Sequence, residues 1–104
     1  MSKPNTAGNV HGYEACIIFD GAMDEKKSVP LLEKYLDVIK SDGGNVAKVE
    51  NWGRRKLAYE IDKKADGIYT IVNFECKSAT SDEFARRIGL EERVLRYKIF
   101  RGDK

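Results

Sequence analysis

The sequence has little of the residue types on which metal sites, disulfide scaffolds and membrane spans depend. It contains 2 cysteines, 2 prolines and 1 histidine in 104 residues. Cys16 and Cys76 form no CxxC pair, and a zinc site needs about four closely spaced ligands, so we expect no metal. We interpret both thiols as small buried side chains in a reducing cytosol. Without a membrane-length apolar run or a recognisable signal peptide, we expect a cytoplasmic protein.

A catalytic constellation is also missing. The only histidine available as a general base is His11, near the N-terminus. The acidic pairs 82–83 and 91–92 are adjacent in the chain, so on regular structure their carboxylates point in different directions. No glycine-rich phosphate loop is present. We therefore expect neither catalysis, nor a cofactor, nor a small-molecule substrate.

The composition fits one compact domain. The chain is 41% hydrophobic and 35% charged, and its 104 residues suffice for a single core. Lys and Arg number 19 against 17 acidic residues, which leaves a net charge of only +2. A chain that binds nucleic acid unaided usually has a larger excess. Any contact with RNA should therefore use a local basic patch, with help from a partner.

Hydrophobic periodicity predicts one domain over residues 13–101, preceded by a flexible arm at 1–12 and followed by a short tail at 102–104. Apolar residues at three- and four-residue spacing predict a first helix. Ser28 is its favoured N-cap, because Pro30 then falls in the first turn, and Asp24 is the alternative start. Residues 41–44, which end in two glycines, should terminate this helix.

The remaining elements are four strands and a short helix. We expect a long strand at 45–62 with a bulge or kink at Gly53, and an Asp-Gly hairpin turn at 63–67. Another strand follows at 68–74. Thr80 and Glu83 form a possible capping box for a second helix that ends at Gly89. With strands at 13–19 and 94–100, the order is strand, helix, strand, strand, helix, strand.

That order predicts an α+β, ferredoxin-like sandwich with a four-stranded antiparallel sheet and two helices on one face. The expected core consists of Ile17, Phe19, Leu32, Leu36, Ile39, Leu57, Ile71 and Phe84.

The same order of elements occurs in RNA recognition motifs, whose third strand displays aromatic residues for base stacking. When Gly67 is aligned with the glycine of that signature, residues 66–73 are the ones compared with it. The glycine fits, but the leading cation and the stacking aromatics are missing, so this interpretation fails.

Several blocks resemble a known family, the bacterial small-subunit ribosomal protein S-six family. They are the Tyr-Glu opening the first strand (13–14), Trp-Gly-Arg-Arg-Lys-Leu-Ala-Tyr-Glu-Ile (52–61), Gly-Ile-Tyr (67–69) and Val-Leu-Arg-Tyr (94–97). The resemblance runs from about Tyr13 to Arg101. It implies a ferredoxin-like fold, binding to the central domain of small-subunit ribosomal RNA, and pairing with ribosomal protein S-eighteen during assembly.

The basic residues indicate where such contacts would lie, because Arg and Lys contact phosphates and an aromatic ring can stack on a base. The candidate RNA- or partner-binding residues are Trp52, Arg54, Arg55, Lys56, Arg93, Arg96 and Lys98. Strand alternation places Arg55 in the row of Leu57 and Tyr59, which we expect beneath the helices. Arg54 and Lys56 should then face the open side of the sheet, free to bind.

Two other classes of function stay open at this level. One is a ferredoxin-like regulatory or ligand-binding module, and the other is a small enzyme on the same fold. Co-sedimentation with small ribosomal subunits separates the ribosomal hypothesis from a free homodimer and from an enzyme without ribosome association.

Overall fold

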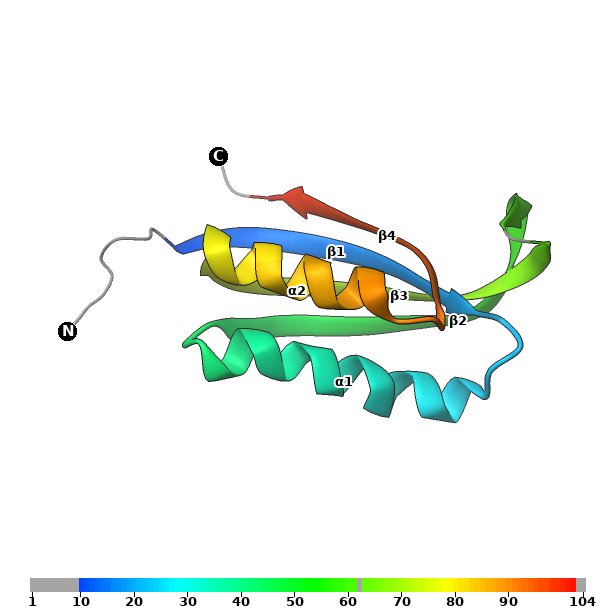
Figure 1. Ribbon diagram of the computed structural model, residues 1–104, viewed down its shortest axis with the longest axis horizontal. Helices are drawn as coiled ribbons and strands as arrows, with labels where there is room; N and C mark the ends of the chain where they lie inside the picture. The colour runs from blue at the N-terminus through cyan, green and yellow to red at the C-terminus, as the bar shows by residue number, and fades with distance from the viewer. Residues whose placement is uncertain (1–9, 62, 103–104) are drawn as a thin grey trace.

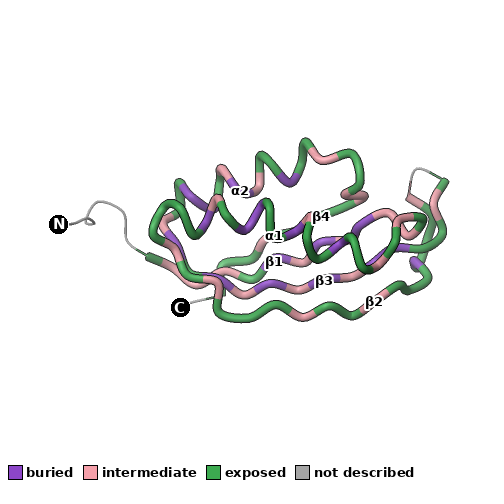
Figure 2. The backbone as a smooth tube through the Cα atoms, turned by 90° about the horizontal axis from the view of Figure 1, so that it is seen from below, coloured by how far each residue is buried: buried purple, intermediate pink, exposed green. Residues whose placement is uncertain are grey.

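The computed structural model describes residues 10–61 and 63–102. The elements in this part of the chain are β1 (Val10–Asp20), α1 (Glu25–Ser41), β2 (Asn45–Ile61), β3 (Lys64–Lys77), α2 (Ser78–Leu90) and β4 (Val94–Arg101) (Figure 1). Over these residues the sheet has four strands in the order β2-β3-β1-β4, and each neighbouring pair is antiparallel. Both helices lie on one side of the strands (Figure 2). The predicted ferredoxin-like fold is confirmed.

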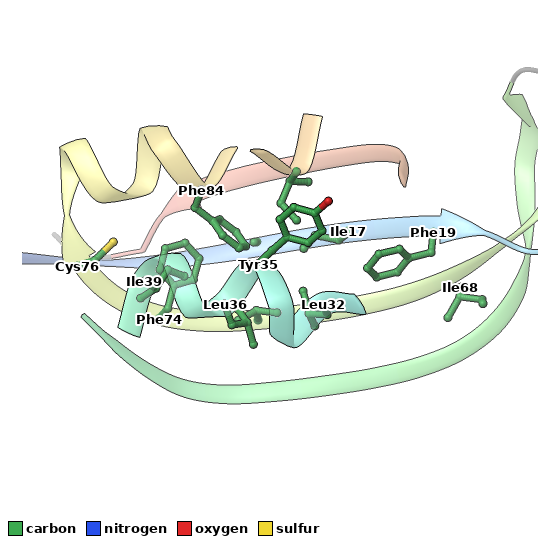
Figure 3. Close-up of a cluster of buried hydrophobic side chains, with 13 residues drawn as sticks. Ile17, Phe19, Leu32, Tyr35, Leu36, Ile39, Ile68, Phe74, Cys76 and Phe84 are labelled. Carbon is green, nitrogen blue, oxygen red and sulfur yellow. The ribbon is translucent and has the colours of Figure 1, made fainter. Parts of the chain in front are cut away.

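The core lies between the helices and one face of the two central strands (Figure 3). Strand alternation gives this face to every second residue. The fully or almost fully buried side chains are Ala15, Ile17 and Phe19 of β1, Leu32, Leu36 and Ile39 of α1, Ile68, Val72, Phe74 and Cys76 of β3, and Phe84 and Ile88 of α2. Most of the predicted core residues are therefore confirmed.

Two predicted core residues lie elsewhere. Ile71 is only half-buried, because Val72 and its even-numbered neighbours take the positions under the helices. The prediction for Ile71 was wrong, since β3 is apolar on both faces and its pattern does not say which one the helices cover. Leu57 is buried, but it is not part of the cluster beneath the helices.

Helix α1 begins at the alternative start. Asp24 is the N-cap, and its carboxylate accepts a hydrogen bond of 2.9 Å from the backbone N–H of Lys26. Ser28, the favoured N-cap, is instead buried within the helix and donates its hydroxyl proton to the carbonyl of Glu25. Pro30 thus lies inside the helix, and the packing of the apolar face outweighs the backbone bond that proline cannot donate.

The end of α1 is as predicted. Gly43 has a φ of +86°, the left-handed conformation that glycine adopts most readily. The N–H of Gly44 donates to the carbonyl of Ile39 at 2.8 Å, and that of Gly43 donates to Lys40 at 3.2 Å. These two bonds form a Schellman motif, which satisfies carbonyls at the helix terminus.

The hairpin turn between β2 and β3 lies earlier than predicted. Ile61 pairs with Lys64, Lys56 pairs with Asp66, and Gly67 is already inside β3. The Asp-Gly sequence is therefore not the turn. A Cβ atom on Gly67 would lie 2.4 Å from Cγ2 of Ile18 and 3.2 Å from Cδ2 of Leu57, so glycine serves close packing here.

Helix α2 does not use the predicted capping box. It begins at Ser78, with Lys77 at the N-cap position, and it continues past Gly89 to Leu90. The Thr80 hydroxyl donates instead to the carboxylate of Asp42, just beyond α1. Glu83, the other half of the predicted box, binds two arginines of its own helix. A carboxylate beyond the end of α1 thus binds Thr80, and two arginines of α2 bind Glu83, in place of the capping box.

The sheet extends beyond the expected domain start. Val10 pairs with Lys77 and Gly12 pairs with Glu75, so residues 10–12 belong to β1 and not to an arm. Gly102 donates its N–H to the carbonyl of Gly12 at 2.8 Å, which ties the first residue of the predicted tail to the sheet. The rest of the predicted arm, 1–9, and of the tail, 103–104, lies outside the described residues.

Candidate nucleic-acid and partner interface

The face of the sheet opposite the helices, here called the open face, is apolar at its centre. Cys16 and Ile18 of β1 and Tyr69 and Ile71 of β3 point to this side and are half-buried. Within the described residues both helices cover the other face (Figure 2). An apolar centre of this kind on an uncovered sheet face is typical of a binding surface.

A bulge at Gly53 decides which basic side chains reach the open face. Asn51 pairs with Thr70 and Gly53 pairs with Tyr69, so Trp52 is an extra residue in β2. Gly53 has a φ of +82°, and its N–H donates to Oδ1 of Asn51 at 2.8 Å. The predicted interruption is thereby confirmed. An extra residue inverts the alternation of every side chain that follows it.

The bulge makes the predicted faces of Arg54 and Arg55 wrong. Arg54 pairs with Ile68, whose side chain lies beneath the helices, and Arg55 pairs with Gly67, whose Cβ position points to the open face. Lys56 pairs with Asp66, is exposed, and therefore also lies on the helix side. The expectation that Arg54 and Lys56 face the open side is thus overturned.

Arg54 is held by the connection between β1 and α1. Its Nε donates to the carbonyl of Gly21 at 2.7 Å, and one Nη donates to the carbonyl of Met23 at 2.8 Å. Glu25 accepts from the backbone N–H of Arg54 at 3.1 Å and lies 3.4 Å from the other Nη. These contacts give Arg54 a structural role.

Arg55 lies over an exposed indole on the open face. Its guanidinium carbon is 5.3 Å from the centre of the Trp52 ring, and the indole is about half exposed. The indole N–H donates to Glu50 at 3.1 Å. Hydrogen bonds from Lys48 and from this N–H hold the pKa of the Glu50 carboxyl below its ordinary value, so Glu50 stays ionised. The Trp52 ring is thereby oriented, and the Arg55 guanidinium over it remains exposed.

Strand β4 adds two further pairs to the open face. The guanidinium carbon of Arg96 lies 5.6 Å from the Tyr59 ring centre, and its Nη1 donates to the Tyr59 hydroxyl at 2.6 Å. The Lys98 ammonium lies 5.6 Å from the Phe100 ring. Tyr59 belongs to β2, at the opposite edge of the sheet, and the far end of the β2–β3 hairpin turns up toward the side of β4 (Figure 1). The hairpin thus meets β4 across the open face.

Comparison with known proteins agrees with this geometry. A family model described as ribosomal protein S6 matches residues 12–101. The chain belongs to the ribosomal protein S6 family. Small ribosomal subunit protein bS6 of Corynebacterium kroppenstedtii is 52% identical over 91 residues, which cover 88% of this chain and 96% of the relative. The protein of that name in Mycolicibacterium paratuberculosis is 48% identical over 92 residues, covering 88% and 96%.

A solved structure from the same family has the same fold. The crystal structure of 30S ribosomal protein S6 from Thermotoga maritima aligns with a TM-score of 0.82 at 29% identity, covering 90% of this chain and 89% of the other. The resemblance to the S-six family read from the sequence is therefore confirmed. Family membership makes the chain a structural protein of the small ribosomal subunit and not an enzyme.

The predicted site residues divide into three groups in the structure. Trp52, Arg55, Arg96 and Lys98 come together on the open face, while Arg54 and Lys56 lie on the helix side. Arg93 lies in the turn before β4, where its carbonyl accepts from the N–H of Asp20 at 2.7 Å. Only some of the predicted site residues therefore take part in the cation–aromatic pairs on the open face.

Two aromatic residues that pair with cations on the open face were not among the predicted site residues. Phe100 could have been found, because it shares the alternation of Arg96 and Lys98 along β4. Tyr59 could not, because its contact joins two strands at opposite edges of the sheet.

Features of other functional classes are not found in the described part of the chain. It holds no group of three or more His, Cys, Asp or Glu side chains placed to bind a metal ion. Neither α1 nor α2 is long and apolar enough to cross a bilayer.

Proposed function

We propose that this chain binds the central domain of small-subunit ribosomal RNA together with ribosomal protein S-eighteen, in the cytoplasm, as a non-catalytic part of the ribosome. Membership of the ribosomal protein S6 family supports the ribosomal part of this proposal. The observation that carries the binding part is the set of three cation–aromatic pairs on the open face.

The chemistry of these pairs suits a ribonucleoprotein surface. A cation over an aromatic ring keeps its charge available to a phosphate, and the exposed ring edge or face can stack on a base or pack against a protein side chain. Trp52 and Phe100 are about half exposed and Tyr59 is more so. The half-buried apolar centre between the pairs gives a protein partner area to cover.

The net charge of +2 is the reason for a second protein in this proposal. Few phosphate contacts give little affinity by themselves, because each contact releases only about one counterion. A partner that covers the apolar centre and adds its own cations would supply the rest of the affinity for RNA. Assembly as a pair is therefore expected to be much tighter than binding of either surface alone.

The test is assembly of the purified chain with a central-domain RNA fragment in the presence and absence of S-eighteen. A double variant, Arg55→Ala with Arg96→Ala, removes two open-face cations and should weaken the ternary complex about 10- to 100-fold. The matched control is Arg86→Ala with Arg87→Ala, which removes the same charge from α2, where both arginines bind Glu83. Equal weakening by the two double variants would overturn the assignment of the open face.

The cellular part of the proposal has its own test. Purified small ribosomal subunits from the source cell should contain this chain in a mass-spectrometric inventory. Its absence there would contradict the proposal whatever the outcome in vitro.

A further inference from the structure

We infer that Arg54 is a positioning residue for the open face, although its own side chain lies on the helix side. The inference rests on the proposed function, because the groups that Arg54 positions are the ones proposed to bind. It concerns how the segment from Trp52 to Tyr59 is held against the rest of the molecule.

Arg54 is the first residue after the bulge, and it is fastened to the β1–α1 connection through both its backbone and its side chain. The guanidinium donates to the carbonyls of Gly21 and Met23. The Glu25 carboxylate receives the backbone N–H and lies close to one Nη. The planar fork of arginine can meet two carbonyls and a carboxylate at once, which a lysine ammonium on a flexible stem cannot reproduce.

This attachment fixes residues on both sides of it. Glycine at a positive φ has wide conformational freedom, so the bulge at Gly53 does not by itself fix the direction of the strand that follows. With Arg54 held on the helix side, alternation sends Arg55 to the open face, beside Trp52. The segment then reaches Arg96 through Tyr59, a further attachment of the hairpin. Arg54 thus orients the binding groups without touching what they bind.

A direct role for Arg54 in binding does not fit these contacts. Its side chain is 41% exposed, yet its donors already meet two carbonyls and a carboxylate. To contact a phosphate with these donors, Arg54 would have to give up its hydrogen bonds to Gly21 and Met23.

The most discriminating variant is Glu25→Ala, because positioning and direct charge predict opposite signs. Removing a negative charge near a surface that binds RNA should strengthen binding if charge alone matters. If Glu25 acts by holding Arg54, assembly with RNA and S-eighteen should weaken about 2- to 30-fold. Arg54→Ala should weaken assembly at least as much as Glu25→Ala. Arg54→Lys should weaken assembly less than Arg54→Ala but more than no substitution. Unchanged or tighter assembly by Glu25→Ala overturns the inference.

Two controls separate positioning from loss of charge and from loss of stability. Lys26→Ala removes one positive charge beside Glu25, from an exposed side chain, and should leave assembly unchanged. Ile39→Val lowers stability in the core, away from the hairpin, and should also leave the affinity of the folded protein unchanged. The two variants are compared where they lower the melting temperature equally. If Ile39→Val then weakens assembly as much as Arg54→Ala, Arg54 is only a stabilising residue and the inference fails.

A measurement without RNA distinguishes failure of the inference from failure of the proposed function. Trp52 is the only tryptophan, so its near-ultraviolet circular dichroism and fluorescence report the orientation of this segment. Arg54→Ala and Glu25→Ala should change both signals well below the melting temperature, and the two controls should not. Unchanged signals overturn the inference, whereas changed signals in a chain that never assembles contradict only the proposed function.

Discussion

Single residues set the geometry of this surface by where they force the backbone. The extra residue at Trp52 inverts the alternation of β2, so that Arg54 joins the helix side and Arg55 the open face. Gly67 acts by size, because Ile18 and Leu57 occupy the space that a side chain would need. In both cases one position decides what several neighbouring side chains can contact.

The role of Gly67 predicts the effect of adding one methyl group. Gly67→Ala should lower the free energy of unfolding by about 1 to 3 kcal/mol, because the new Cβ would overlap Ile18 and meet the backbone carbonyl of Phe19. Chemical denaturation measures the change. Gly12→Ala is the matched control, since a Cβ there meets nothing within 4 Å, and it should be nearly neutral. A neutral Gly67→Ala would mean that β3 and its neighbours can move apart at little cost.

At the scale of elements, α1 connects most parts of the fold. Its apolar face lies on the sheet, its C-terminal turn leads into β2, and its Tyr35 reaches the connection after α2. The helix keeps Pro30 in its interior, so tertiary packing and not local propensity determines where it starts. Two predictions address this packing.

The side chain of Leu36, a residue of α1, is almost fully buried in the core, so its truncation should leave a cavity. Leu36→Ala is expected to lower the free energy of unfolding by about 2 to 5 kcal/mol. Val29, on the same helix and exposed at 37%, supplies the control Val29→Ala, which should change it by about 0.5 kcal/mol or less. Similar values for the two variants would show that the buried face of α1 is assigned wrongly.

The hydrogen bond from the Tyr35 hydroxyl to Glu91, at 2.5 Å, should make stability depend on pH. It lowers the pKa of the Glu91 carboxyl, and burial together with this bond raises the pKa of Tyr35 to about 12. A lowered carboxyl pKa stabilises the fold above the ordinary pKa of glutamate, and this stability is lost as the pH falls through the lowered value. Tyr35→Phe should therefore lose about 1 to 2 kcal/mol near pH 7, and the difference from wild type should shrink in acid. Denaturation at pH 7 and at pH 3 tests this, and a difference that grows in acid would contradict it.

At the scale of the whole molecule, charge is nearly balanced while its distribution is not. The net charge is +2, yet the open face gathers Arg55, Arg96 and Lys98 beside aromatic rings. Carboxylates elsewhere neutralise other cations, as Glu83 does for two arginines, whose hydrogen bonds lower its pKa to about 2. Nonspecific attraction to nucleic acid is thereby limited while one surface keeps available cations.

This distribution predicts a weak and shallow salt dependence for the chain alone. Three open-face cations would release about two to three counterions, so the logarithm of the binding constant for RNA should fall with a slope of about −2 to −3 against the logarithm of salt concentration. Titrations between 50 and 200 mM salt, with and without S-eighteen, measure it. A nanomolar complex of the chain alone at physiological salt would contradict the expectation.

The order of the elements, most of the core and the family are all predictable from residue order. Periodicity located the apolar face of α1, paired glycines located its end, and the motif at 52–61 indicated the ribosomal family. These features depend on local spacing, which the chain carries in its own residue order.

The packed sheet and helices set which face of each central strand is covered and what the basic residues contact. β3 is apolar on both sides, so the position of the helices decides that Val72 is core and Ile71 is not. The bulge was foreseeable from Gly53, but its effect on alternation depends on the register with β3. The partners of Arg54, Tyr59 and Thr80 lie more than 25 residues away in the chain, and contacts at such separations exist only once the sheet and helices have assembled.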